Sequence, residues 1–183
     1  MMLNNKKYTL LIDSKRCINC KACIVACRAE NKVKLGNSRL WINEEHRGEW
    51  PKISANFEPE QCHHCESPSC VRVCPTGASY KRPDGVVLIN SEECVGCRYC
   101  IIACPYNARY ANEELGVPDK CTYCAHRLQR GEPPACVETC PTKVRIFGDA
   151  NDPNGVVAEM LNTRQYRVKK PETGNGPQIF YLR

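Results

Sequence analysis

The sequence is poor in the residues that build an ordinary hydrophobic core. Its 183 residues include two Trp and three Phe, and the apolar fraction of 42% also counts sixteen cysteines. Small domains with so little core need another source of stability, such as bound metal or disulfides. Long hydrophobic runs are also absent, and no stretch approaches the ~18 apolar residues that cross a bilayer. We therefore expect a chain that reaches a membrane only through a partner.

Motifs of catalysis and of nucleotide binding are absent as well. The chain has no Gly-x-Gly-x-x-Gly fingerprint, no P-loop, no nucleophile elbow and no metal motif with an open coordination position. Its first residues, Met-Met-Leu-Asn-Asn-Lys-Lys-Tyr, do not have the apolar core of a secretory signal peptide. These absences exclude the common enzyme classes and predict that the chain has no catalytic residues of its own.

Cysteine, in contrast, is abundant and falls into four groups of four. The third group is followed by proline and has two, two and three residues between its cysteines. This is the run found in bacterial ferredoxins, where three thiolates bind one [4Fe–4S] cluster and the fourth binds a second cluster. The groups are Cys17, Cys20, Cys23 and Cys27; Cys62, Cys65, Cys70 and Cys74; Cys94, Cys97, Cys100 and Cys104; and Cys121, Cys124, Cys136 and Cys140. Because no cysteine is left over, the sequence predicts four [4Fe–4S] clusters.

Three other interpretations of this composition are weaker. Disulfides suit cysteine-rich secreted chains, but these cysteines are clustered at metal-type spacings. Zinc ribbons also use Cys-x-x-Cys pairs, but zinc requires neither the third and fourth cysteines nor the proline. A net charge of +6 suits nucleic-acid binding, but four clusters with their thiolates would add about −8. We interpret the basic residues as charge balance and expect no nucleic-acid partner.

The segments between the cysteines predict an α+β fold of two ferredoxin-like units with small sheets, short helices and many loops. Strand patterns cover 8–12, 39–43, 78–80, 86–89 and 144–147, and helical patterns cover 21–31 and 156–162. The hairpin around Asp84-Gly85 joins the second and third groups. We predict that residues 58–118 form a unit inserted into an outer unit of residues 1–57 plus 119–150. Residues 151–183 are then a C-terminal extension whose polar tail is either an exposed arm or a segment that wraps over a partner.

In a two-cluster unit each group gives three ligands to one cluster and its last to the other. The adjacent second and third groups are expected to pair, which leaves the first and fourth to pair with each other. The predicted ligands are Cys17, Cys20, Cys23 and Cys140 for cluster A; Cys121, Cys124, Cys136 and Cys27 for cluster B; Cys62, Cys65, Cys70 and Cys104 for cluster C; and Cys94, Cys97, Cys100 and Cys74 for cluster D.

Other polar residues flank these groups. With sixteen thiolate places filled, no coordination place remains for His46, His63, His64 and His126. We expect the histidines to hydrogen bond to neighbouring groups or to be exposed. The cations Lys15, Arg16, Lys21 and Arg98 flank the cysteine loops. They either raise the cluster potentials or are solvated surface charges.

With these groups in place, the chain resembles the iron–sulfur electron-transfer subunits of molybdopterin oxidoreductases of the dimethyl sulfoxide reductase family. Besides the sixteen cysteines, the motifs that carry the resemblance are Cys27-Arg-Ala-Glu-Asn31, Glu60-Gln-Cys-x-x-Cys65, Val73-Cys-Pro-Thr-Gly-Ala-Ser-Tyr80, Lys120-Cys-Thr-Tyr-Cys-Ala-His-Arg127 and Pro134-Ala-Cys-Val-Glu-Thr-Cys-Pro141. Arg28, which stands where a ferredoxin has proline, also fits this family. Within it, the chain is most similar to the polysulfide reductase subunit, with the thiosulfate, tetrathionate and arsenate reductase subunits next.

The resemblance implies a non-catalytic subunit that conducts electrons between a membrane quinone subunit and a molybdopterin catalytic subunit. It implies that cluster A faces the molybdenum subunit and cluster D the membrane subunit. Cys97 stands where nitrate reductase relatives have tryptophan, which implies a four-iron cluster, and the tail has no membrane helix of the formate dehydrogenase kind. The family implies attachment to the cytoplasmic membrane through a partner, on the periplasmic face after co-export, with the cytoplasm as the alternative. The alternative function is a soluble polyferredoxin that serves a hydrogenase or formate-linked enzyme.

Overall fold

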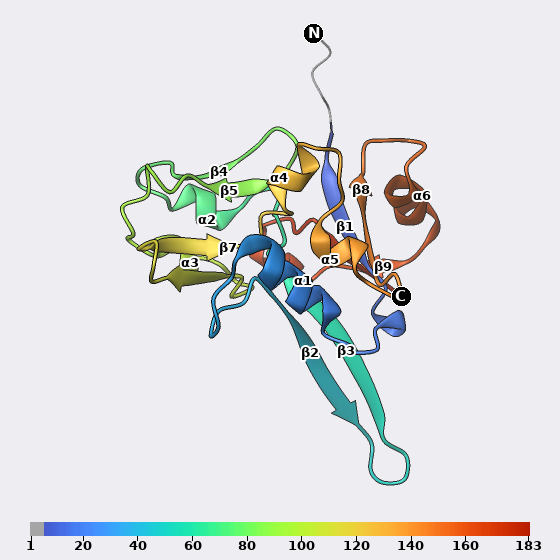
Figure 1. The fold of residues 1–183 in the computed structure, drawn as a ribbon. Helices are drawn as coiled ribbons and strands as arrows, with labels where there is room; N and C mark the ends of the chain where they lie inside the picture. Colours follow the sequence, from blue (N-terminus) through green and yellow to red (C-terminus); the bar gives the residue numbers. More distant parts are fainter. Residues whose placement is uncertain (1–5) are drawn as a thin grey trace.

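The two ends of the chain form one four-stranded sheet (Figure 1). In the computed structural model, which describes residues 6–183, strands β1 (Tyr8–Ile12), β8 (Arg145–Asp149), β9 (Tyr166–Arg167) and β10 (Ile179–Leu182) stand in the order β8-β1-β10-β9. Strand β1 runs antiparallel to β8 and parallel to β10. The apolar run Leu10-Leu11-Ile12 is buried, as expected for a central strand that is covered on both faces.

The two faces of this sheet have different neighbours. Helix α6 (Val156–Thr163) covers one face, where Val157 packs with Leu11 of β1 and Leu182 of β10. Leu10 points to the opposite face and belongs to a buried cluster with cysteines of the second and fourth groups. This alternation follows the two-residue period of a strand. It means that the sheet separates an ordinary apolar core from a cysteine-lined one.

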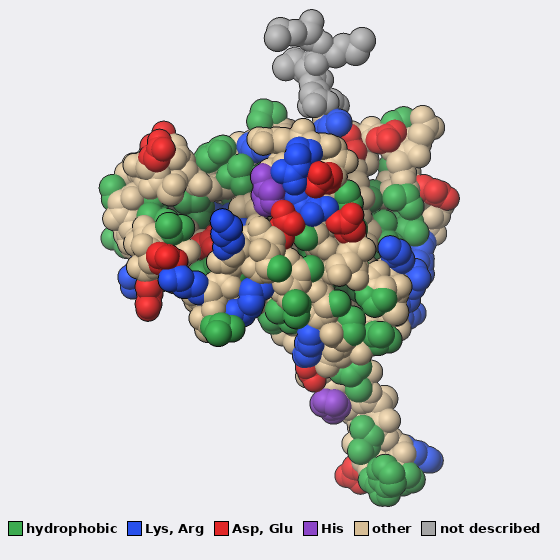
Figure 2. Space-filling model, in the orientation of Figure 1, with side chains coloured by type: hydrophobic (Ala, Val, Ile, Leu, Met, Phe, Trp, Pro, Cys, Tyr) green, Lys and Arg blue, Asp and Glu red, His purple; other side chains and the backbone are tan. Residues whose placement is uncertain are grey.

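Three hairpins complete the strand structure. They are β2 (Leu40–Arg47) with β3 (Ser54–Gln61), β4 (Ser79–Lys81) with β5 (Val87–Ile89), and β6 (Arg109–Asn112) with β7 (Val117–Lys120). The β2–β3 hairpin projects well beyond the rest of the molecule (Figure 1). Apolar side chains gather at its far end (Figure 2), where Trp50 is 86% exposed.

The helices accompany the cysteine groups. Helix α1 (Ala22–Asn31) carries Cys23 and Cys27. Four single-turn helices are α2 (Ser69–Arg72), α3 (Tyr99–Ile102), α4 (Ala125–Leu128) and α5 (Ala135–Glu138), and 3₁₀ turns occur at η1 (Ser14–Arg16) and η2 (Pro171–Thr173). Helix α1 contacts α5, whereas α2 contacts α3. Figure 1 accordingly shows α1 beside α5, while α2, α3 and the β4–β5 and β6–β7 hairpins form the other side of the molecule.

Several predicted elements are confirmed with small shifts of their ends. Strand β1 has the predicted bounds, helix α1 begins one residue later than predicted, and the β4–β5 hairpin turns at Gly85, which has a φ of +85°. Strand β2 continues beyond the predicted 39–43 to Arg47, because it pairs along its length with β3, which the polar sequence of residues 54–61 did not indicate.

One of the two alternatives for the C-terminal tail is wrong for its last strand. Residues 179–182 are not an exposed arm, because strand β10 lies inside the main sheet between β1 and β9. Ile179 is fully buried and Tyr181 is 1% exposed. The short apolar run Ile-Phe-Tyr-Leu at the end of a polar segment explains this placement. No helix in the described part of the chain is long and apolar enough to cross a membrane.

Candidate metal centre

The cysteines meet in sets that combine different groups. One hollow is lined by Cys17, Cys20, Cys23 and Cys140; a second by Cys27, Cys121, Cys124 and Cys136; and a third by Cys62, Cys65, Cys70 and Cys104. Each hollow therefore has three cysteines from one group and one from another. We call these sets A, B and C, after the predicted clusters with the same residues. None of the sixteen cysteines forms a disulfide.

The fourth set, Cys94, Cys97, Cys100 and Cys74, lies nearer the surface and is called set D. Cys97 is exposed, Cys94 and Cys74 are half-buried, and Cys100 is buried in α3. The contact between α2 and α3 brings the second group, which ends at Cys74, next to the third. The assignment of Cys74 to this set stays a prediction.

The same backbone turn recurs in all four Cys-x-x-Cys loops. The residue two positions after the first cysteine has a positive φ in each: 56° at Asn19, 42° at His64, 68° at Gly96 and 51° at Tyr123. Three of these residues are not glycine, so the conformation costs roughly 1–3 kcal/mol at each. Left-handed residues in such tight turns are a feature of nests, which are concave arrays of backbone N–H groups that bind anions and are found at iron–sulfur sites.

Burial and the repulsion between neighbouring thiolates both make it unfavourable to ionise the four thiols of a set. Burial, and then the charges of Cys136 and Cys124, raise the pKa of Cys27 to about 12. In set C, burial followed by the charges of its three neighbours raises the pKa of Cys65 to about 12. A set of thiolates therefore needs a positively charged core, and iron supplies one.

Hydrogen bonds to sulfur lower the pKa of the last cysteine in the second and fourth groups. The N–H of Val144 donates to Cys140 Sγ and that of Ser79 to Cys74 Sγ, both at 3.3 Å. Burial acts to raise the pKa of both thiols, but these N–H donors and their neighbours outweigh it and lower the pKa. The backbone after Cys-Pro thus stabilises a thiolate where a cluster ligand is predicted.

Three buried cations that the sequence patterns did not predict lie among the sets. Arg109, Lys120 and Arg145 are 5%, 1% and 2% exposed. Arg109 Nη2 donates to Cys70 Sγ at 3.0 Å, and Lys120 Nζ donates to the carbonyl oxygen of Cys121 at 2.7 Å. In contrast, Arg98 beside Cys97 is exposed. The buried cations had one sequence signal, because Arg109 and Arg145 each stand five residues after a Cys-Pro cysteine.

These features fit a polynuclear iron–sulfur cluster better than a single metal ion. Among residues 6–183, no three or more His, Cys, Asp or Glu side chains converge closely enough to bind one ion. Buried N–H groups without partners, Nη1 of Arg109 and Nε and Nη2 of Arg145, belong to residues that line the hollows of sets C and A. An anionic cluster at each set would provide acceptors for them.

The two adjacent histidines are fully enclosed, which rules out the exposed alternative. His64 stacks on Tyr123 with ring centroids 3.7 Å apart, and its Nδ1 accepts a hydrogen bond from the N–H of Val87. His63 stacks on Tyr106 at 4.0 Å. Because His64 and Tyr123 lie inside the Cys-x-x-Cys loops of sets C and B, their stack connects the two loops. His126 pairs with Glu30 at 2.6 Å instead.

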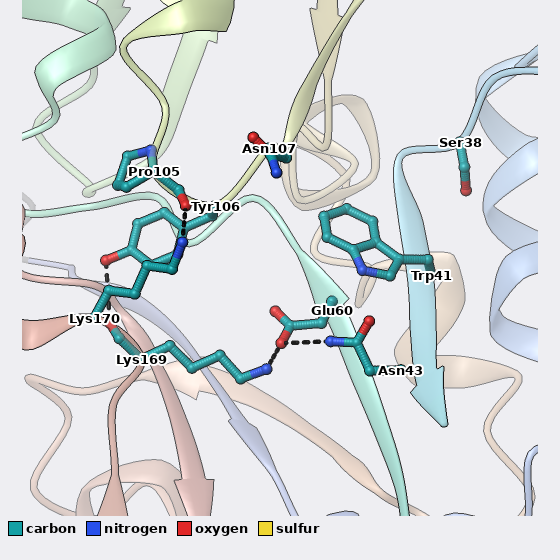
Figure 3. Close-up of a pocket in the computed structure, with 9 residues that line it drawn as sticks. All are labelled: Ser38, Trp41, Asn43, Glu60, Pro105, Tyr106, Asn107, Lys169 and Lys170. Carbon is teal, nitrogen blue, oxygen red and sulfur yellow. Dashed lines mark hydrogen bonds and ion pairs between the residues drawn. The ribbon is translucent and has the colours of Figure 1, made fainter. Parts of the chain in front are cut away.

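A surface pocket of about 400 Å³ adjoins set C (Figure 3). It is lined by Ser38, Trp41, Asn43, Glu60, Pro105, Tyr106, Asn107, Lys169 and Lys170. Its charged groups already have partners, since Lys169 pairs with Glu60 and Lys170 donates to the carbonyl oxygen of Pro105. We therefore assign the pocket no catalytic role.

The cysteine sets, the nests and the buried cations define an iron–sulfur electron carrier. Two models of the 4Fe-4S dicluster domain match the chain, at residues 53–150 and 16–78. The chain is 44% identical to the B subunit of tetrathionate reductase from Salmonella typhimurium, over 96% of this chain and 72% of that protein. It is 43% identical to the B polypeptide of polysulfide reductase from Wolinella succinogenes, over 97% and 94%.

A third relative, the iron-sulfur B component of a putative dimethyl sulfoxide reductase from Halobacterium salinarum, is 37% identical over 96% of this chain and 78% of its own length. The protein belongs to this family of 4Fe-4S dicluster iron–sulfur subunits of reductase complexes. It is an electron-transfer subunit and not a catalytic one, as the sequence predicted.

Proposed function

We propose that the protein binds four [4Fe–4S] clusters, one at each cysteine set, and conducts electrons through a series of clusters arranged in the order A, B, C and D. A [4Fe–4S] cluster supplies one-electron oxidation and reduction when bound. The observation that carries the proposal is that three quartets of cysteines, each drawn from two groups, line three separate hollows. The contacts of α1 with α5 and of α2 with α3 support an inner unit of residues 58–118 inserted into an outer one.

Exposure supports this order. Sets B and C are the inner ones, because all their cysteines are buried except the half-buried Cys104. Sets A and D each include an exposed cysteine, Cys20 and Cys97. The stacked rings of Tyr123 and His64 connect set B to set C, so the proposed series has sets A and D at its two ends.

Exposed apolar side chains lie beside both set A and set D. Ile18 and Val25 beside set A are 61% and 64% exposed, and Val95 and Ile102 beside set D are 67% and 83% exposed. Exposed apolar side chains that gather at one place on a surface, as these pairs do, mark interaction surfaces. We propose that a molybdopterin catalytic subunit docks at set A and a membrane quinone subunit at set D, in a reductase of the polysulfide, thiosulfate, tetrathionate or arsenate type.

In this arrangement the chain's own residues bind and separate the clusters and exclude water from the two inner sets. Attachment to the cytoplasmic membrane would be through the quinone subunit. We place the complex on the periplasmic face.

The ligand sets can be tested one cysteine at a time. In the purified complex, Cys140→Ser and Cys17→Ser should alter the same cluster in electron paramagnetic resonance spectra, and Cys27→Ser should alter the cluster that Cys121→Ser alters. Loss of two different signals from the first pair would overturn the proposed connection between the ends of the chain. Molybdenum and a membrane subunit should co-purify with the chain, and a stable iron-loaded monomer would favour a free polyferredoxin.

A further inference from the structure

Arg109 is enclosed between the two cysteine sets of the inner unit. Its Nη2 donates to Cys70 Sγ at 3.0 Å and to Ser79 Oγ at 2.8 Å, while its Nη1 is buried without a partner. Burial acts to lower the pKa of Arg109, but the charges of Cys70, Cys62 and Cys100 raise it. The guanidinium contacts set C directly at Cys70 and approaches set D through Ser79, whose N–H donates to Cys74 Sγ at 3.3 Å. Cys100 of set D also packs with Cys70 in one buried cluster, so one guanidinium lies next to both sets.

Arg145 has the equivalent place between the two sets of the outer unit. Its Nη1 donates to Gln61 Oε1 and lies 3.9 Å from Cys136 Sγ of set B. The side chain lines the hollow of set A, and its electrostatic neighbours include Cys23 of that set. Its Nε and Nη2 are buried without partners.

The two positions are produced by the internal repeat. Arg109 stands five residues after Cys104-Pro, at the start of β6, and Arg145 stands five residues after Cys140-Pro, at the start of β8. The corresponding residue after Cys74-Pro is Ser79, whose hydroxyl accepts from Arg109. Each unit therefore has one arginine at the same position of the repeat, five residues after the cysteine of a Cys-Pro pair.

Such burial is unfavourable without an anion. A guanidinium stays charged in a protein, and burying it without a counter-charge costs several kcal/mol. Arg109 also faces Lys120 directly across the β6–β7 pair, and like charges opposite one another destabilise a sheet. The hydrogen bonds around Arg109 go to a thiol and a hydroxyl, so the cysteine sets are the source of compensating negative charge.

We infer that Arg109 raises the reduction potentials of clusters C and D together, and that Arg145 raises those of clusters A and B together. The inference rests on the ligand sets of the proposed function. Reduction adds one electron and hence one negative charge to a cluster, and a fixed buried cation favours that state. Because each guanidinium faces both sets of its unit, the two potentials of a unit move together.

This pairing has a consequence for conduction. Shifts in the same direction at both clusters of a unit change the potential difference inside that unit less than they change the difference between the units, between clusters B and C. The two arginines therefore act mainly on the driving force of the middle step.

The test is a redox titration of the purified complex, followed by electron paramagnetic resonance. In Arg109→Gln, two of the four clusters should show at least a tenfold fall in the reduced-to-oxidised ratio at a fixed potential, which is a downward shift of about 59 mV for one electron. Arg145→Gln should shift the other two. The control is Arg98→Gln, which removes an exposed arginine beside Cys97 and should shift every cluster far less, because solvent screens its charge.

The inference would be overturned if either Gln variant shifted the potential of one cluster only, or of none. It would also be overturned if both variants shifted the potential of the same cluster. Iron and sulfide analysis of the wild-type complex separates this from failure of the proposed function, which predicts four clusters. If a Gln variant loses iron, the Lys variant at the same position decides. Arg109→Lys or Arg145→Lys keeps the charge, so its paired potentials should stay within about threefold of the wild-type ratio. A tenfold fall in a Lys variant would contradict a role for charge.

Discussion

Strand β10 makes the last residues of the chain essential to the cysteine-lined core. Ile179 is fully buried, lies opposite Leu10 of β1, and packs in one cluster with Cys62 and Cys140. An Ile→Ala change at such a site costs about 2–5 kcal/mol through lost contacts and a residual cavity. A domain of this kind is stable by about 5–15 kcal/mol in total, so Ile179→Ala removes a large fraction.

The measurement is thermal unfolding of the iron-loaded protein without oxygen, followed by circular dichroism and cluster absorbance. A loss of 2–5 kcal/mol corresponds to a fall of about 4–20 °C in Tm for a chain of this size. The matched control is Ile53→Ala, because Ile53 is 55% exposed in the β2–β3 hairpin and should change stability by no more than about 0.5 kcal/mol. Equal Tm values for the two variants would refute the role of β10 in the core.

Two further predictions concern the cysteine loops. Gly96→Ala should lower the iron content per chain, because the added Cβ would lie 2.9 Å from the carbonyl oxygen of Gly116. The control is Gly116→Ala, because Gly116 has the same φ of +68° but open space for a Cβ. Equal iron loss in both variants would contradict the steric reason. Burial lowers the pKa of His63 from 6.5 to about 4. Between pH 6.5 and pH 4, therefore, the imidazole binds a proton in the unfolded chain but not in the folded one. The free energy of unfolding should fall by up to about 3 kcal/mol as the pH is lowered through this range. His63→Phe, which keeps a ring against Tyr106, should flatten this dependence in denaturant titrations at pH 4 to 7, and an unchanged slope would count against it.

The parts of the structure that the sequence predicted depend on local patterns. The apolar run of β1, the Asp84-Gly85 turn and the helix after the first cysteines are each encoded within about a dozen residues. The three cysteine hollows could be anticipated because ferredoxin geometry limits how the last ligand of each group is shared. These features needed no knowledge of distant contacts.

The parts that were missed depend on distant contacts or on charge. Residues 54–61 are polar and contain Pro59, so their pairing with β2 had no local signal. The apolar run of β10 is four residues long, and its place in the sheet is set by a parallel partner near the other end of the chain. Arg109 and Arg145 are residues normally found at surfaces. Burying them is favourable only next to an anionic cofactor. Residue patterns alone do not show which arginines lie close to that cofactor.

The sheet that joins the two ends also imposes an order on how the protein is made. Strand β1 is synthesised long before its parallel neighbour β10. The β4–β5 and β6–β7 hairpins, in contrast, close within a few residues of chain, and contacts this local form early. The protein is therefore expected to mature from its middle outward. Iron delivered before Cys121 to Cys140 have been synthesised could complete only sets C and D, whose ligands lie between Cys62 and Cys104, and sets A and B would be filled later.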